Sequence, residues 1–194
     1  RLQNFIHIIS EQMAQSDTVE KGYEKIIHSI KEVLGVNLVG FLHYNSLNQL
    51  EIEASLLNGK FAQHIEPPEI QPDKILYFTS LLKKEGIIYI PDVHETELLI
   101  KDDLLNVNIK SFYAKPLKQK NNLIGILVLG YPYPHEWNQN KVDFINTISS
   151  IILQNLVQDK TRIKLRRINE NFINIFENSS DAVFIVSLNG EIIE

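Results

Sequence analysis

Residues 111–130 have the sequence SFYAKPLKQKNNLIGILVLG. Two apolar, β-rich runs, at 110–118 and 123–130, flank the polar stretch 119–122. A short polar connection between two such runs favours a β-hairpin. This part of the chain therefore predicts two neighbouring antiparallel strands.

The region before this hairpin alternates between helical and extended patterns. Apolar residues recur every three or four positions over 18–34, which predicts an amphipathic helix that ends at Gly35. The runs 36–44 and 49–57 predict a second hairpin, and residues 58–71, with Gly59, Pro67 and Pro68, are interpreted as irregular.

The segment between the hairpins predicts two helices and a strand. Pro72 suits the first turn of a helix that ends at Gly86, 87–90 is a short strand, and 96–105 is a second short helix whose apolar face Asp102 and Asp103 interrupt. A long helical pattern then passes through 144–156. This order predicts an α+β domain in which a mixed, largely antiparallel sheet has helices on both sides.

Composition excludes several functions for this chain. The 19 basic and 24 acidic side chains give a net charge of −5, and no dense basic patch is available to follow a nucleic-acid backbone. The basic run 160–167 lies in a helical pattern and is interpreted as a solvated face. No apolar run approaches the roughly 20 residues of a membrane-spanning helix, and the first residues lack the layout of a signal peptide. We expect a cytoplasmic location and no membrane insertion by this chain.

The chain contains no cysteine. Disulfides, thiolate nucleophiles, zinc–thiolate sites and thioether-linked chromophores are therefore excluded together.

Several short segments, taken in order, resemble the GAF family of small-molecule sensory domains over residues 15–156. They are VLGVN at 33–37, VGFL at 39–42, EGIIYIPDV at 85–93, SFYAKPL at 111–117 and LIGILVL at 123–129. The resemblance implies the profilin-type α+β fold shared by GAF and PAS domains: an antiparallel sheet flanked by helices on both sides, with long N- and C-terminal helices.

A second resemblance begins near Asn171, where FINIFENSSDAVFIV at 172–186 and NGEII at 189–193 are similar to the entry of a PAS domain. The expected organisation is a connector helix at 1–15, a GAF-like domain at 16–156, a signalling helix at 157–176 and the truncated start of a PAS-like domain at 177–194. A chain that begins at Arg1 and ends at Glu194 within a strand-like pattern is interpreted as part of a longer protein.

This domain order implies a sensory module of a multidomain signalling protein, of which a sensor histidine kinase is the first expectation. A diguanylate cyclase or phosphodiesterase is the alternative output. A second hypothesis is a dimerisation and relay module without a ligand, whose own side chains fill the pocket.

Ligands of such domains are expected between one face of the sheet and the helices that connect its strands, in a mainly apolar pocket with few polar groups. Completion of the core is the competing interpretation for its aromatic residues. The expected lining residues, taken from the strands and from the connection at 58–110, are Phe41, His43, Tyr77, Phe78, Tyr89, Asp92, Ser111 and Tyr113.

Haem, metal and catalytic roles lack support in the sequence. His43 and His94 have no second ligand at a diagnostic spacing, so a core or loop histidine is favoured over a haem or metal ligand. No nucleophile elbow, phosphate-binding glycine loop or distinguished carboxylate pair is present, and an enzyme is therefore only a third hypothesis.

A final pattern concerns the end of the long helix. Ile145, Ile148 and Ile152 begin a 3–4 spacing that Asn155 and Asp159 interrupt. Leu165, Ile168, Phe172 and Ile175 then resume it and predict the seam of a parallel homodimer. Such a helix can report the state of a pocket to a following domain through small rotations or register shifts.

Overall fold

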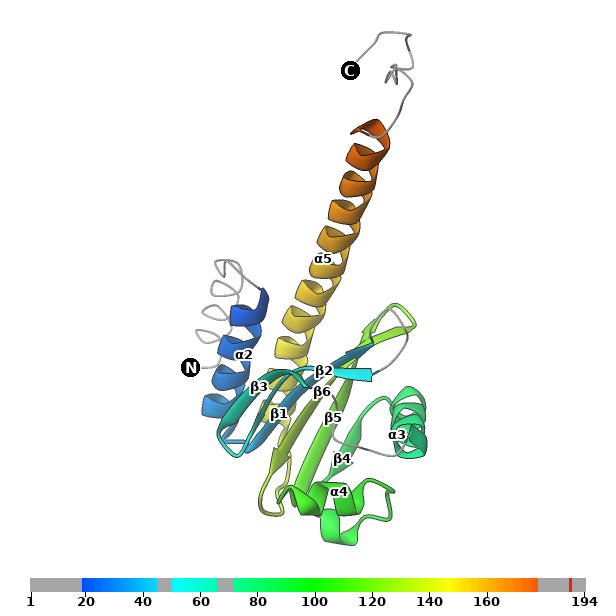
Figure 1. Cartoon of the computed structure of the whole chain (residues 1–194). Helices are drawn as coiled ribbons and strands as arrows, with labels where there is room; N and C mark the ends of the chain where they lie inside the picture. The colour runs from blue at the N-terminus through cyan, green and yellow to red at the C-terminus, as the bar shows by residue number, and fades with distance from the viewer. Residues whose placement is uncertain (1–18, 45–49, 66–71, 178–188, 190–194) are drawn as a thin grey trace. The chain divides into compact units, whose positions relative to one another are not determined.

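The computed structural model describes residues 19–44, 50–65, 72–177 and residue 189. Within these residues lies an antiparallel sheet of six strands in the order β3-β2-β1-β6-β5-β4 (Figure 1). The strands are β1 (Leu38–Tyr44), β2 (Leu50–Leu57), β3 (Lys60–Ile65), β4 (Ile88–Ile90), β5 (Ser111–Gln119) and β6 (Asn122–Tyr131). The two predicted hairpins are confirmed, because β1 pairs with β2 and β5 pairs with β6.

The described helices are α2 (Val19–Leu34), α3 (Pro72–Glu85), the 3₁₀ turn η1 (Val93–Glu95), α4 (Lys101–Asn106) and α5 (Gln139–Glu177). Gly35 ends α2 at a positive φ of 69°, which glycine adopts without the steric cost that a side chain brings. The chain divides into two compact units after Gln154, and the first unit contains the sheet.

Each face of the sheet is covered by a different set of helices. In β1, Val39 and Phe41 point to one side, and the Phe41 ring lies 5.8 Å from that of Tyr23 in α2. Leu38 and Leu42 point to the other side and pack against the cluster that contains Phe78 of α3. We call these the α2/α5 face and the α3/α4 face. Helices on both sides of an antiparallel sheet are what the sequence predicted.

Strand β3 corrects the interpretation of residues 58–71 as irregular. It pairs with β2 from Leu57 and Lys60 onward. Asn58 and Gly59 form the turn between them with φ of 50° and 82°. Two positive φ values in a two-residue loop match the twist of flanking strands, and Asn-Gly is the favoured sequence for such a turn. The signal for this hairpin was present in the sequence, and the prolines further on obscured it.

The second short helix begins later than predicted. The chain forms η1 at 93–95, and α4 starts only at Lys101. Asp102 and Asp103 lie in the first turn of α4, where a carboxylate is stabilised by the positive end of the helix dipole. The two aspartates thus favour the start of this helix, and they do not break its apolar face.

Two predicted parts lie outside the described residues. They are the connector helix at 1–15 and, except for Glu177 at the end of α5 and Asn189, the PAS-like segment at 177–194.

Candidate functional site

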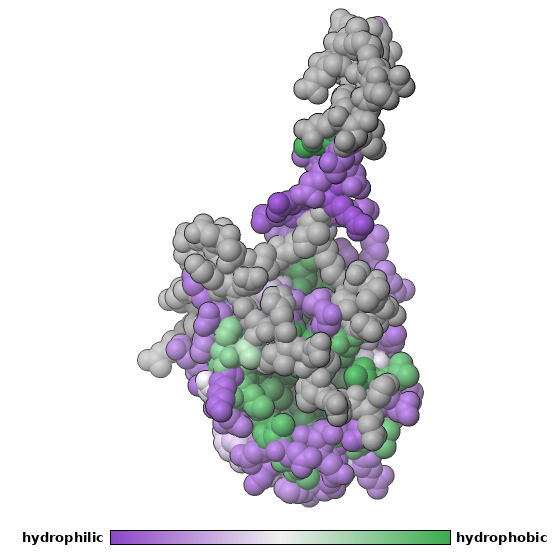
Figure 2. Space-filling view, viewed as in Figure 1, coloured by the Kyte–Doolittle hydropathy of each residue, from purple (hydrophilic) through white to green (hydrophobic). Residues whose placement is uncertain are grey.

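The α3/α4 face carries a continuous apolar surface. Its buried members come from α3, η1, α4 and strands β4 to β6, and include Phe78, Ile90, Phe112 and Val128. Partly buried leucines surround them: Leu38, Leu42, Leu50, Leu57, Leu81, Leu98, Leu105 and Leu123. In the view of Figure 2, apolar side chains are visible over the sheet among polar ones. A mainly apolar surface beneath connecting helices is the usual composition of a small-molecule site.

Helices α3 and α4 are tied to this face and to each other. The rings of Phe78 in α3 and Phe112 in β5 lie 6.1 Å apart. The Lys74 ammonium of α3 lies 2.9 Å from the Asp103 carboxylate of α4, with both side chains partly exposed. A partly exposed pair of this kind contributes at most about 1 kcal/mol, so it can open at small cost. The ion pair therefore provides a polar, easily broken border to the apolar surface.

The α2/α5 face is organised by polar contacts to the connector 132–138 and to α5. The Ser111 hydroxyl donates to the carbonyl of His135 at 3.1 Å and accepts from the Trp137 indole nitrogen at 3.1 Å. The Trp137 backbone N–H donates to the Tyr89 hydroxyl at 3.2 Å. The Lys115 ammonium donates to the Asn146 side-chain oxygen in α5, and burial lowers the pKa of Lys115. These contacts fix the connector and the start of α5 to β5.

Tyr113 lies on the same face, packed against Trp137 with ring centroids 5.1 Å apart. Its hydroxyl is buried and has no hydrogen-bond partner, and burial raises its pKa. An unpaired buried hydroxyl costs about 1–3 kcal/mol. The other buried side-chain atom without a partner among the described residues is His43 Nδ1, on the same face.

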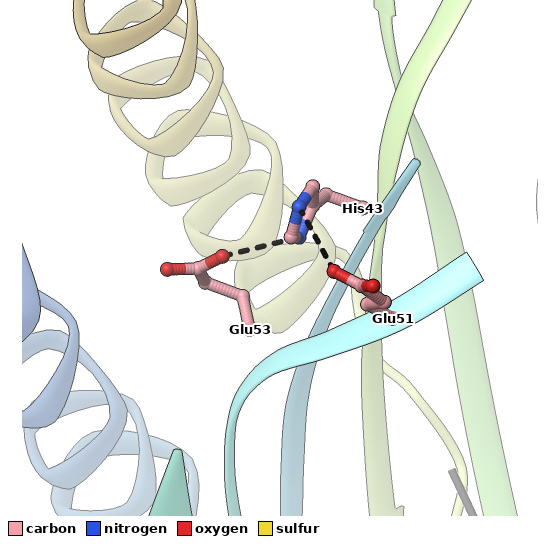
Figure 3. A network of polar contacts seen from close by, with 3 residues as sticks. All are labelled: His43, Glu51 and Glu53. Atoms are coloured by element: carbon pink, nitrogen blue, oxygen red, sulfur yellow. Dashed lines mark ion pairs between the residues drawn. The ribbon is translucent and has the colours of Figure 1, made fainter. Parts of the chain in front are cut away.

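His43 lies between two carboxylates of β2 (Figure 3). Its Nδ1 atom is 3.1 Å from Glu53 Oε2 without a hydrogen bond, and its Nε2 atom is 3.9 Å from Glu51 Oε2. The register of β1 with β2 shifts between Phe41 and Leu42, which leaves Glu53 as an extra, bulged residue. Such bulges re-aim side chains. Because the two carboxylates approach different ring nitrogens, they do not converge on one point.

The pattern of the GAF domain family matches residues 18–156. The chain belongs to the GAF domain family. No curated protein sequence matches it.

Solved GAF domains share this fold at low sequence identity. The GAF domain of an Acinetobacter phosphoenolpyruvate-protein phosphotransferase is 14% identical, with a TM-score of 0.61 over 84% of this chain and 96% of that one. A domain of a putative two-component sensor histidine kinase from Sinorhizobium meliloti 1021 is 16% identical, with a TM-score of 0.59 over 78% and 99%. The phycocyanobilin-bound GAF domain of a cyanobacterial phytochrome is 16% identical, with a TM-score of 0.65 over 84% and 97%.

The eight residues predicted to line a pocket of this GAF domain do not lie together. Phe78 lies in the apolar cluster of the α3/α4 face, and Tyr77 precedes it in α3 as a half-buried residue. Asp92 caps η1, where its carboxylate accepts from the His94 backbone N–H at 2.9 Å. The other five belong to the α2/α5 face: Phe41, His43, Tyr89, Ser111 and Tyr113. One pocket cannot be lined by all eight.

Sequence reasoning missed the leucines of the α3/α4 face and the Lys74–Asp103 pair. The alternation in β1 indicated that Leu42 and Tyr44 share a face opposite that of Phe41 and His43. It did not indicate which of the two faces meets α3. The Lys74–Asp103 pair joins residues 29 positions apart and has no sequence signal.

Metal and membrane roles gain no support from the GAF structure. In the described part of the chain, no three His, Cys, Asp or Glu side chains are grouped to hold a metal ion. None of the helices described here is both long and apolar enough to cross a membrane.

Proposed function

We propose that this GAF domain is a sensory regulatory module that binds a small molecule against its α3/α4 face. The observation that carries the proposal is the set of partly buried leucines, from the sheet, α3, α4 and the connection between these helices, that pack against the apolar cluster. A ligand with an apolar body would complete their burial, at about 25 cal/mol for each Å² of apolar surface removed from water. Its polar groups would meet Lys74 and Asp103 at the border of the surface.

A bilin would bind this chain without a thioether link. The similar cyanobacterial GAF domain is phycocyanobilin-bound, but this chain has no cysteine for a thioether link. For the signalling context, we propose a multidomain sensor in which a PAS-like segment follows α5, with a histidine kinase as the output. The likeness to a domain of a putative sensor histidine kinase supports this context.

The ligand's position can be tested with two adjacent substitutions. A thermal-shift screen of cyclic nucleotides, amino acids, organic acids and biliverdin should yield at least one stabilising compound. At a hundred times its Kd, it would contribute about 2.7 kcal/mol, or roughly 5–10 °C for a chain of this size. Leu42→Gln should abolish that shift, because Leu42 faces α3.

His43→Gln is the matched control, since it introduces the same side chain one residue later on the opposite face. It should retain the shift. The opposite pattern would place the ligand on the α2/α5 face. A screen without any stabilising compound would contradict ligand sensing and favour the relay module, whose interior the fully buried Leu82, Ala114 and Ile126 already fill.

The proposed route of the signal is a homodimer formed through α5. Leu165, Ile168 and Phe172 are 62%, 55% and 46% exposed within this helix. They recur at three- and four-residue spacing, so they form one stripe on the helix. The predicted fourth seam residue, Ile175, lies in α5, and its side chain is outside the described set. A second copy of the chain would cover the stripe.

A further inference from the structure

A chain of polar contacts through Lys141 and Tyr131 links four segments of the domain. Lys141, in the first turn of α5, lies with its ammonium 3.0 Å from the Tyr131 hydroxyl at the end of β6 and 2.7 Å from Nε2 of His135 in the connector. The Tyr131 hydroxyl donates in turn to the carbonyl of Leu34 at the end of α2. The rings of Tyr131 and His135 are 4.1 Å apart.

The direction of these hydrogen bonds defines the protonation states. The only acceptor for the buried Tyr131 proton in this chain of contacts is Leu34 O, so Lys141 donates to the tyrosine oxygen. An ammonium has donors only, and His135 Nε2 must therefore offer its lone pair. The histidine is neutral with its proton on Nδ1, because lysine ordinarily holds a proton far more strongly than histidine does.

The surroundings of His135 favour this neutral state. Burial, and then the charge of Lys141, lower the pKa of His135, and the nearby Glu136 carboxylate opposes them. Burial also lowers the pKa of Lys141. Burial, and then Tyr133, raise the pKa of Tyr131 to about 12, so this hydroxyl stays protonated. The titratable groups that face His135 are thus Lys141 from α5, Tyr131 from β6, and Tyr133 and Glu136 from the connector.

We propose that Tyr131, His135 and Lys141 form a proton-sensitive latch that holds the start of α5 to the ends of β6 and α2. Once His135 takes a proton, two cationic donors face each other at hydrogen-bond distance and the contact between them is lost. The His135 ring is the less mobile partner, because it packs against the rings of Tyr131 and Trp137, with centroids 4.1 Å and 5.8 Å away, whereas lysine has a flexible four-carbon side chain. Lys141 therefore departs and gives up its bond to Tyr131.

The release affects the attachment of α5 rather than the helix itself. The first turn of α5 is capped independently, since the Lys141 backbone N–H donates to the Asn138 side chain at 3.1 Å. Acid would thus loosen the joint between the sheet and α5 while the helix persists. This joint lies on the α2/α5 face, opposite the leucine surface that we propose for the ligand.

The sign of the pH dependence follows from the lowered pKa. The unfolded chain takes up the His135 proton near its ordinary pKa of 6.5, before the folded chain does. Stability from the neutral histidine is therefore present above that pH and is lost as the pH falls through the lower folded value.

Trp137 provides a direct test because it is the only tryptophan of the chain. Its ring contacts His135 edge to face, with centroids 5.8 Å apart, and a protonated imidazole quenches indole emission. Tryptophan emission of the 194-residue chain should therefore fall in a step with a midpoint below pH 6.5. His135→Gln, which keeps an acceptor but does not titrate, should remove this step.

Two charge variants should move the midpoint in opposite directions. Lys141→Met removes the repelling charge and should raise the midpoint of the emission step, whereas Glu136→Gln removes the opposing carboxylate and should lower that midpoint.

Amide hydrogen exchange tests the attachment of α5 directly. At pH 5.5, amide exchange over 139–145 should be faster in the wild type than in His135→Gln, and at pH 8 the two should agree. A step that survives His135→Gln, or a midpoint that neither charge variant moves, would overturn the latch.

Discussion

Replacement of Phe112 by alanine is expected to lower the free energy of unfolding by about 3–5 kcal/mol. Phe112 lies in β5 with only 4% of its surface exposed, and it belongs to the buried cluster of the α3/α4 face. Its ring also provides the contact surface for Phe78 of α3. The alanine variant loses the apolar transfer energy of the ring and leaves a cavity beneath α3 that the rigid sheet cannot fill by collapse.

Urea unfolding followed by circular dichroism measures this loss. Leu76→Ala is the matched control, because Leu76 lies in α3, two residues before Phe78, and is 65% exposed. Its stability should change by less than about 0.5 kcal/mol. Equal losses for the two variants would show that the α3/α4 cluster is not the main core on this side of the sheet.

Local patterns were sufficient to predict most of the fold. The helix over 18–34 and the two hairpins each carry their own periodicity and turn residues, and these signals do not depend on distant contacts. Strand β3 is different. KFAQHI at 60–65 has little β-branched character, and its extended form depends on pairing with β2, a neighbour that only the Asn58-Gly59 turn indicates.

The candidate site was harder to predict because it depends on which face of the sheet each helix covers. Alternation placed Phe41 and His43 together and opposite Leu42, and the structure has them so. No local pattern indicates that α2 covers one face of the sheet and α3 the other, because that choice depends on how segments far apart in the sequence pack together. The aromatic residues were therefore selected by type, and most of them belong to the face that holds α5.

The same limit explains why the latch was not predicted. Tyr131, His135 and Lys141 are close in sequence. Which of them donates and which accepts is decided by Leu34 O, which takes the Tyr131 proton and lies 97 residues from Tyr131. Before that contact is known, the segment 131–141 is only a proline-containing connector followed by a helix. The protonation states of these three side chains can therefore be inferred only once the contact with the Leu34 carbonyl is known.

The combined substitution Leu165→Glu and Phe172→Glu is expected to convert the proposed homodimer into monomers. Each copy would lose two apolar side chains, and burial of one such side chain stabilises by about 1.5–3 kcal/mol. Four are lost per dimer, and each 1.4 kcal/mol changes a dissociation constant about tenfold. Because Leu165 and Phe172 are 62% and 46% exposed in α5, the dimer can bury only about half of each side chain, or about 3 kcal/mol in all at the lower value. The dissociation constant should therefore rise by roughly a hundredfold or more, before the mutual repulsion of the new carboxylates is included.

Multi-angle light scattering at several protein concentrations measures this change. Ile173→Glu is a demanding control, because Ile173 is 44% exposed and adjacent to Phe172, yet lies off the stripe. That variant should keep the mass of the wild type, while Phe172→Glu alone should already shift the equilibrium towards monomer. Dissociation by both single variants would indicate a general effect of charge on α5, and a dimer that withstands the double substitution would place the contact elsewhere. A monomeric wild type would contradict the proposal that a dimer of α5 helices carries the signal from the GAF domain to a following domain. It would not affect the ligand proposal, because the leucine surface belongs to the other unit of the chain.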